Sequence, residues 1–416
     1  MLRLFPLILG ALGWLAMGTQ GSLAADTVAP ASTVTAPVAP LSTEQSDALV
    51  AELKLAGQSI TESGQVPALG IAVVTSGKVL MAEGFGTTQV QSGTPVTDQT
   101  VFRLASVSKT LTAGLLALLV EDRFLNWTTP VEAYMPGVRF KDPHTAANLT
   151  LEQLLSHRTG LPHHTFDLRI EANEEFHALV DAFGTVTPKC QPGDCYAYQN
   201  VAFSLAGVVA EAATGDFIDV LMTKRLFLPL GMRTASMGRT ALIGSDSWAR
   251  PHIRRRGRWR AVDPLPTYYR LPAAAGVNAS PADLAIWLQA LLGAYPEVLD
   301  ANALAEIGET RIDTPTEIRG SSWRGVRLRQ AGYGLGVRVF DYAGHRLIFH
   351  AGAVQGYRAL MGVLPDNDFG VVVIWNSETS LPSGLFPTIL DRRLGLTEKQ
   401  WIKLPKVSQP ARAAAR

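Results

Sequence analysis

The chain carries little charge of either sign. Charged residues make up 18% of its 416 residues, and 37 Lys and Arg nearly balance 36 Asp and Glu, which leaves a net charge of +1. A balance this even excludes a generally basic nucleic-acid-binding protein. Apolar residues make up 47%, which excludes a disordered chain and provides material for a large buried core. The chain is too long for one ordinary domain, so we expect two structural lobes.

Several common motifs are also missing. There is no G-x-S-x-G turn, which argues against an α/β-hydrolase. Neither a G-x-G-x-x-G fingerprint nor a Walker loop occurs, so nothing indicates a dinucleotide or a nucleoside triphosphate. No repeat has the period of a solenoid. We therefore expect no cofactor.

Cysteine is nearly absent. Cys190 and Cys195 lie five positions apart in KCQPGDCY. In an oxidising compartment such a pair closes a small disulfide loop, here turned by Pro192 and Gly193. A metal site is the alternative, but it needs more ligands than this pair has nearby. We expect a Cys190–Cys195 disulfide and no metal.

Long apolar runs are confined to the start of the chain. Residues 1–24 combine one positive charge, an apolar stretch and small residues at the end, which is the pattern of a cleaved secretory signal peptide. An uncleaved membrane anchor is the alternative, although the run is short for a span of about 20 residues. A Pro- and Ala-rich linker (25–42) follows, and a basic tail (401–416) ends the chain. These features predict a periplasmic or secreted protein with no stable membrane span after cleavage.

The N-terminal part of the expected domain, 43–400, mixes helix and strand. Residues 43–62 are typical of a helix, and two β-rich runs around Ser76-Gly77 are typical of a hairpin. Residues 106–123 have an unbroken apolar centre that is longer than a usual strand. They predict a buried helix.

The C-terminal part returns to strands from residue 333: YGLGVRVF, HRLIFH, YRALMGVLP and FGVVVIWN, before a helix at about 384–394. Strands from about 43–105 and 330–400 are therefore expected to form one sheet flanked by helices. A mostly helical region, about 106–329, is inserted between them. This is an α+β fold with a cleft between lobes, where small-molecule sites tend to lie.

Ser106 and Lys109 in FRLASVSKT are the first candidate site residues. A serine in the first turn of a helix lies at the positive end of its dipole, and a lysine three residues later lies on the same face. An ammonium beside an apolar helix is poorly solvated, which favours the neutral amine and fits it to take the serine proton. A capping serine with a surface lysine is the alternative, and one S-x-x-K alone does not exclude it.

Tyr198 and Asn200 come just before a helical segment in YQNVAFSLAG. A tyrosine near a cationic lysine is expected to have a lowered pKa and to act as a general base. An amide two residues later in an extended loop points to the same side and is suited to bind a substrate. The alternative is a buried tyrosine with an asparagine that caps the next helix.

His350 and Gly352 lie at the end of a predicted strand in FHAGAVQGY. A strand edge with small residues lets a substrate backbone lie alongside and pair with exposed N–H groups. His350 is suited to donate to a substrate carboxylate or to steady Tyr198. A lone histidine at a strand end is the alternative.

Together the three motifs resemble those of the serine β-lactamase and penicillin-binding-protein family, in its class C branch. S-x-x-K, Y-x-N and H-x-G each occur once and in the order of that family. The likeness covers about residues 45–395 and includes LLSHRTGLP, YYRLPAAAGVNASPADLAIW and YGLG. It implies a β-lactamase/transpeptidase-like fold with an antiparallel sheet flanked by helices.

The resemblance also implies a reaction: a serine attacks a carbonyl, forms an acyl-enzyme and is released by water, with an oxyanion hole of backbone N–H groups. The implied catalytic residues are Ser106, Lys109 and Tyr198, and the implied substrate-binding residues are Asn200, His350, Gly352 and Ala353.

The implied substrate is a small molecule: a β-lactam or a D-alanyl peptide. The alternatives are a carboxylesterase of the same family and a penicillin-binding sensor that does not hydrolyse. Efficient class C β-lactamases carry lysine where His350 stands, and a neutral imidazole binds a carboxylate less firmly than an ammonium does.

Two other clusters have simpler interpretations. His157, His163 and His164 lack the spacing of a metal site. The basic run Arg254–Arg260 suggests a patch for an anionic polymer, but a solvated hairpin is favoured because the rest of the chain is mildly acidic.

Overall fold

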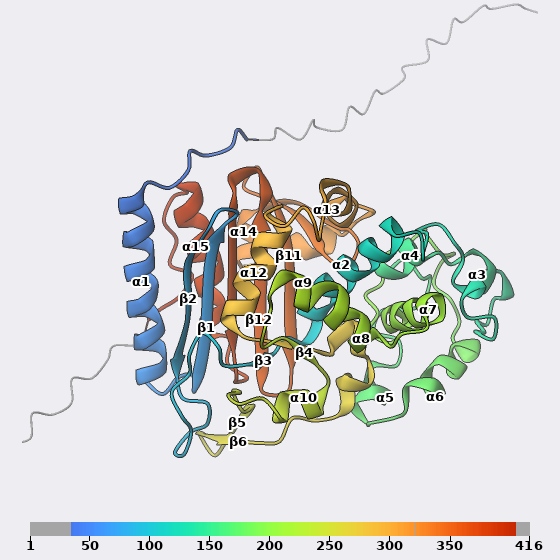
Figure 1. Ribbon diagram of the computed structural model, residues 1–416, viewed down its shortest axis with the longest axis horizontal. Coiled ribbons are helices and arrows are strands. Elements are labelled where there is room, and N and C mark those ends of the chain that lie inside the picture. The colour runs from blue at the N-terminus through green and yellow to red at the C-terminus, as the bar shows by residue number, and fades with distance from the viewer. Residues whose placement is uncertain (1–34, 321, 405–416) are drawn as a thin grey trace, which may run out of the picture. The chain divides into compact units, whose positions relative to one another are not determined.

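The computed structural model describes residues 35–320 and 322–404. The predicted signal peptide, the first part of the linker and most of the basic tail lie outside the described residues. Within the described part, an eight-stranded sheet has the order β2-β1-β13-β12-β11-β10-β9-β8 (Figure 1). Its neighbouring strands are antiparallel throughout. This confirms the α+β fold with one sheet built from both ends of the chain.

The predicted N-terminal hairpin is present. β1 (Ala68–Thr75) and β2 (Lys78–Gly86) pair across the Ser76-Gly77 turn, and β1 pairs on its other side with β13 (Phe369–Trp375). Both β1 and β13 are buried along almost their whole length, because helices cover both faces of the sheet. This explains why they read as unbroken apolar runs.

One face of the sheet is covered by helices from opposite ends of the chain, α1 (Thr43–Glu62) and α15 (Leu385–Leu394) (Figure 1). Ile71 packs in this layer, whereas its neighbour Ala72 packs in the layer on the other face. The alternation follows from the two-residue period of a strand. The helices predicted at 43–62 and about 384–394 are thereby confirmed.

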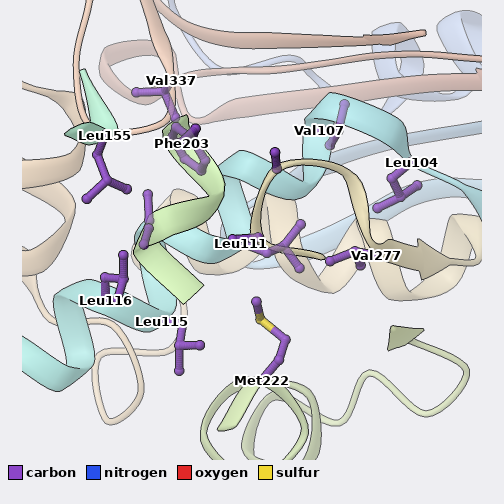
Figure 2. Close-up of a cluster of buried hydrophobic side chains, with 14 of the residues drawn as sticks. Leu104, Val107, Leu111, Leu115, Leu116, Leu155, Phe203, Met222, Val277 and Val337 are labelled. Carbon is purple, nitrogen blue, oxygen red and sulfur yellow. The ribbon is translucent and has the colours of Figure 1, made fainter. Parts of the chain in front are cut away.

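The other face carries α12 (Pro281–Leu291) and α2 (Ser108–Glu121), which connect the sheet to the helical region. Apolar side chains of α2, among them Leu111 and Leu115, pack in this core (Figure 2). The buried helix predicted at 106–123 is confirmed, with one difference. Its first turn is a separate 3₁₀ turn, η1 (Ala105–Val107).

The strand predicted for YGLGVRVF is wrong in its first half. Tyr333 ends β9 (Leu328–Tyr333), the chain then bends, and RVF of the predicted strand lies in β10 (Arg338–Tyr342). Gly336 in this bend has a φ of +67°, and a Cβ there would lie 2.5 Å from the Lys109 carbonyl oxygen. The bend therefore packs directly on α2, and glycine permits that approach.

The other elements complete the chain. The helices are α3 (Pro143–Asn148), α4 (Leu151–Leu155), α5 (Asp167–Glu171), α6 (Phe176–Asp181), α7 (Leu205–Thr214), α8 (Ile218–Met222), α9 (Leu228–Leu230), α10 (Arg239–Ile243), α11 (Pro272–Ala275), α13 (Ala301–Gly308) and α14 (Trp323–Arg327). The strands are β3 (Phe102–Arg103), β4 (Ser236–Met237), β5 (His252–Arg255), β6 (Arg258–Ala261), β7 (Val277–Ala279), β8 (Ile312–Asp313), β11 (His345–Val354) and β12 (Tyr357–Leu364). No helix among the described residues is long and apolar enough to cross a bilayer.

Candidate active site

Ser106 lies on the tight turn η1, between β3 and α2. The preceding residue, Ala105, has a φ of +50°, a left-handed conformation that costs a residue with a side chain on the order of 1 kcal/mol. Leu104 and Val107 hold the turn because both are fully buried in the core (Figure 2). A strained turn held by packing fixes the direction of its serine hydroxyl.

Lys109 stands beside that hydroxyl. Its Nζ lies 3.4 Å from Ser106 Oγ, 2.8 Å from Asn200 Oδ1 and 3.1 Å from the Ala274 carbonyl oxygen. Burial lowers the pKa of Lys109 to about 7, because the ammonium loses its hydration, although the charge of Asp167 opposes this. Much of Lys109 is therefore neutral at physiological pH, as the sequence predicts.

The three contacts of Lys109 define what its neutral amine can do. A neutral amine has two N–H donors and one lone pair. The Asn200 amide oxygen and the Ala274 carbonyl only accept, so they take both N–H groups. The lone pair is left facing Ser106 Oγ, which is the geometry of a base that takes the serine proton.

Tyr198 contacts the same serine. Its hydroxyl is hydrogen-bonded to Ser106, and its ring centroid lies 4.9 Å from Lys109 Nζ. The expected lowering of its pKa is wrong: burial raises the pKa of Tyr198, and this outweighs the opposing effects of the Ser106 hydrogen bond and the Arg338 charge. Tyr198 therefore keeps its proton at neutral pH and is suited to be a proton donor rather than a general base.

Both ends of the Asn200 side-chain amide have a partner inside the protein. Its Oδ1 accepts from Lys109, and its Nδ2 donates to Asp167 Oδ2 at 2.9 Å. It does not cap the next helix, because neither η4 (Ala202–Ser204) nor α7 has a side-chain cap. The second N–H of Nδ2 has no partner among the described residues, so a donor to a substrate carbonyl remains.

His350 does not fit its expected role as a donor to substrate. Gln199 N–H donates to His157 Nδ1, so His157 Nε2 donates to the Tyr333 hydroxyl, which in turn donates to His350 Nε2. His350 Nδ1 then donates to the carbonyl of Ala351. Burial lowers the pKa of both histidines well below the ordinary value, so both are neutral.

This hydrogen-bond network makes His350 unavailable to a substrate. His350 is 1% exposed, and both of its ring nitrogens have partners inside the protein. It offers no N–H to a substrate carboxylate, and no hydrogen bond from it reaches Tyr198. Its role in this structure is to tie β11 to β9 through Tyr333.

Gly352 allows β11 to reach the serine turn. A Cβ at this position would lie 2.1 Å from the Leu104 carbonyl oxygen and 3.3 Å from Ser106 N. Only a glycine permits this approach, which brings β11, the strand that contains Ala353, against the nucleophile. The approach supports the expected oxyanion hole of Ser106 and Ala353, which remains a prediction.

A cavity of about 380 Å³ opens beside Ala353. This volume is within the usual range for small-molecule sites. Its walls come from both lobes: Arg103, Glu171, Leu265, Thr267, Tyr268, Ala353, Val354, Gln355, Arg358 and Glu378. The sequence predicts a cleft between the lobes, and Ala353, Val354 and Gln355 belong to FHAGAVQGY. It does not reveal most of the other lining residues, because they are scattered along the chain.

The structure adds site residues that the sequence analysis did not assign. Asp167 and the Ala274 carbonyl lie around Asn200 and Lys109, while His157 and Tyr333 lie behind His350. His157 and Tyr333 belong to the quoted LLSHRTGLP and YGLG segments, so a signal for them existed. Asp167 has none.

The histidine cluster has other partners. His163 Nδ1 accepts from Tyr198 N at 2.8 Å, and His164 Nδ1 lies 2.6 Å from Asp167 Oδ2. Across residues 35–320 and 322–404, no group of three or more His, Cys, Asp or Glu is arranged to hold a metal. The basic run forms the predicted hairpin of β5 and β6, whose Arg255 and Arg258 are exposed.

The predicted disulfide between Cys190 and Cys195 is present. The loop it closes is attached to the turn after α4, because Gly193 N donates to the Arg158 carbonyl at 2.8 Å and Ala197 N donates to the His157 carbonyl at 3.0 Å. We therefore expect the disulfide to brace the segment that leads into Tyr198.

We expect the double variant Cys190→Ser/Cys195→Ser to lose stability and some activity while it stays folded. Opening so small a ring lowers the free energy of unfolding by about 2 kcal/mol. Urea unfolding and substrate turnover check this, with dithiothreitol treatment of the native protein as the matched comparison. A variant as stable and as active as the native protein would show that the bridge does not brace Tyr198.

Comparison with known proteins places the chain in a family. The Beta-lactamase family model matches residues 47–395, so the chain belongs to the β-lactamase family. A solved structure, the octameric penicillin-binding protein homologue from Pyrococcus abyssi, has the same fold: the TM-score is 0.72 at 23% identity, over 86% of this chain and 78% of that one.

Three curated relatives are similar in sequence. The unguisins hydrolase ungD of Aspergillus violaceofuscus is 27% identical over 80% of this chain and 62% of its own length. Penicillin-binding protein 4 of Amycolatopsis lactamdurans is 27% identical over 83% and 89%, and the D-aminopeptidase of Gluconobacter oxydans is 25% identical over 85% and 69%. The chain thus spans about three fifths of the unguisins hydrolase.

Proposed function

We propose that this protein is a serine hydrolase that cleaves an amide or ester bond through an acyl-enzyme on Ser106. The observation that carries the proposal is that one serine hydroxyl contacts both a base with a pKa of about 7, Lys109, and a protonated phenol, Tyr198. Membership of the β-lactamase family supports it, since the relatives include a hydrolase and a D-aminopeptidase.

The proposed reaction assigns each proton. Ser106 Oγ attacks the carbonyl carbon while neutral Lys109 takes its proton. The bond to the leaving group breaks, the leaving atom takes a proton from Tyr198, and protonated Lys109 restores the Tyr198 proton. Backbone N–H groups of Ser106 and Ala353 stabilise the oxyanion. Water then attacks the acyl ester, which regenerates the serine hydroxyl and releases the acid.

For the substrate we propose a peptide or amide of a D-residue ahead of a β-lactam. His350 has no N–H free for the carboxylate that a β-lactam carries, which disfavours strong β-lactamase activity. Two kinds of relative, a penicillin-binding protein and a D-aminopeptidase, carry D-residue or penicillin chemistry in their names. A carboxylesterase and a sensor that acylates without turnover are the alternatives.

A substrate with a free amine is favoured by the cavity beside Ala353. Glu171 and Glu378 are exposed in its wall and have no ion-pair partner among the described residues. Of its two arginines, Arg358 donates to the carbonyls of Val354 and Tyr357. Arg103 donates to the Leu265 carbonyl through Nη1, while its Nε and Nη2 have no partner among the described residues. An ammonium on the acyl group would meet these carboxylates.

The experiment is a turnover panel with native protein and Ser106→Ala. It contains D-alanine p-nitroanilide, its N-acetyl form, a D-alanyl-D-alanine peptide, nitrocefin and p-nitrophenyl acetate. Turnover of the anilide above its N-acetyl form supports the free amine, whereas ester turnover alone supports the carboxylesterase. No turnover of any compound, or turnover that survives Ser106→Ala, would overturn the proposal.

We also propose that the protein is periplasmic or secreted. The pattern of residues 1–24 supports this, and so does the Cys190–Cys195 disulfide, a bond that persists in oxidising compartments. Cell fractionation tests it, and recovery only from the reducing cytosol would contradict it.

A further inference from the structure

Asp167 is a carboxylate inside the catalytic cluster that no motif predicts. It begins α5, and its Oδ2 accepts from Asn200 Nδ2 at 2.9 Å and lies 2.6 Å from His164 Nδ1. Asn200 Oδ1 in turn lies 2.8 Å from Lys109 Nζ. A continuous line of hydrogen bonds therefore runs from the catalytic lysine through one amide to this carboxylate.

The other oxygen of Asp167 has no partner. Oδ1 is enclosed and accepts no hydrogen bond from the described residues. Carboxylates inside proteins normally find donors for their oxygens, because an unpaired buried oxygen costs about 1–3 kcal/mol. Among the described residues, no Lys or Arg lies within ion-pair distance of Asp167, whose one such contact is His164. Apart from His164, no basic side chain of the described residues pairs with this carboxylate, which lies one amide away from Lys109.

The orientation of Asn200 follows from this carboxylate. An anion accepts and does not donate, so the NH₂ group of Asn200 must face Asp167. The amide oxygen must then face Lys109, where it takes one N–H of the amine. A reversed amide would set its oxygen against the carboxylate, which is repulsive.

We propose that Asp167 is a positioning residue for the catalytic lysine: it orients the Asn200 amide, and its charge stabilises Lys109 in the protonated state that follows proton transfer. The inference rests on the proposed function, in which Lys109 is the base. Asp167 itself touches neither the serine nor the reacting atoms, so its effect passes through Asn200 and through space.

No other group that we find around Lys109 supplies the negative charge that Asp167 supplies. Several titratable or charged groups face Lys109 or Asp167 from the surrounding elements. They are Arg338 on β10, His350 on β11, His157 after α4, Tyr198 in a loop, Tyr268 in the 3₁₀ turn Thr267–Arg270, and His163 and His164 before α5. Arg338 lowers the pKa of Lys109, whereas Asp167 raises it and is the stronger of the two. His157 and His350 are neutral, since burial lowers the pKa of each.

The test is the pH dependence of kcat/KM in native protein and in Asp167→Asn. The variant keeps the size of the side chain and an oxygen that accepts from Asn200, but it loses the charge. Removing the anion destabilises the ammonium, so the pKa of Lys109 falls and the acid limb of the profile moves to lower pH by about one unit. Asp167→Ala, which also loses the hydrogen bond, should lower the plateau of kcat/KM as well.

A second readout does not need turnover. Native protein, Asp167→Asn and the control Glu132→Gln are labelled with [¹³Cε]lysine, and Lys109 is assigned from its missing signal in Lys109→Met. Glu132 is an exposed carboxylate in the 3₁₀ turn Val131–Ala133. We expect the midpoint of the Lys109 titration to fall by about one unit in Asp167→Asn and to stay unchanged in the control.

The outcomes are distinct. A downward shift of the Lys109 midpoint in Asp167→Asn supports the inference even if the panel finds no substrate, in which case the proposed function fails alone. An unchanged midpoint overturns the inference, and so does a lower plateau with an unmoved acid limb, because a merely structural residue would give that result.

Discussion

Replacing Lys109 with methionine should lower kcat/KM for the best substrate of the panel by about 10³-fold. Methionine has a similar length and fills the same buried space, but it has no lone pair for the proton of Ser106. Lys109 Nζ is the only amine within hydrogen-bond reach of that serine among the described residues. The steady-state rate measures the effect, and Lys78→Met, at an exposed lysine that begins β2, is the matched control.

The same substitution should leave the fold intact and stabilise it at neutral pH. The pKa of Lys109 is about 7 in the folded protein against 10.5 for an ordinary lysine, so between these values the unfolded chain binds a proton that the folded chain does not. The stability of the native protein relative to Lys109→Met should therefore rise by a few kcal/mol from pH 7 to pH 10. Urea unfolding at both pH values measures this.

Two results would contradict this account of the lysine. A Lys109→Met variant that keeps more than a tenth of native kcat/KM would show that another group takes the serine proton. A stability difference that does not change with pH would show that Lys109 stays charged in the folded protein.

Replacing Gly352 with alanine should lower kcat/KM by about 10²-fold. The new Cβ would lie 2.1 Å from the Leu104 carbonyl oxygen, so β11 and the serine turn must move apart. A displacement of about 1 Å at a reacting centre lowers the rate by about 10²-fold. Overpacking of this kind also lowers the free energy of unfolding by about 1–3 kcal/mol.

Gly77→Ala is the control for this steric argument. A Cβ at Gly77 meets nothing within 4 Å, so the substitution should change neither turnover nor stability appreciably. If Gly352→Ala behaves like this control, the close approach of β11 to the serine turn is not required for activity. A crystal structure of Gly352→Ala would show which of the two segments moves.

Contacts between residues that are close in the chain could be predicted from the sequence. Ser106 and Lys109 are three residues apart on one helical turn, so their contact follows from helix geometry. The strands of both chain ends were readable because burial on both faces makes them continuously apolar. The bend at YGLG was missed because it is as apolar as a strand, and only its contact with α2 reveals it.

Properties set by tertiary burial could not be read from motifs. The pKa of Tyr198 was expected to fall beside a lysine, but enclosure by both lobes raises it. His350 was expected to donate to substrate, but Tyr333 and Ala351 take both of its ring nitrogens. Asp167 lies in no motif and reaches Lys109 only because folding sets α5 against Asn200.

The most direct measurement is the site of acylation. Native protein and Ser106→Ala are mixed with a penicillin or a p-nitrophenyl ester, quenched in acid within seconds and digested, and the peptides are weighed by mass spectrometry. We predict the mass of the acyl group on the peptide that contains Ser106 in native protein and on no peptide of the variant. An adduct on another residue, or hydrolysis by Ser106→Ala at the native rate, would contradict the acyl-enzyme account.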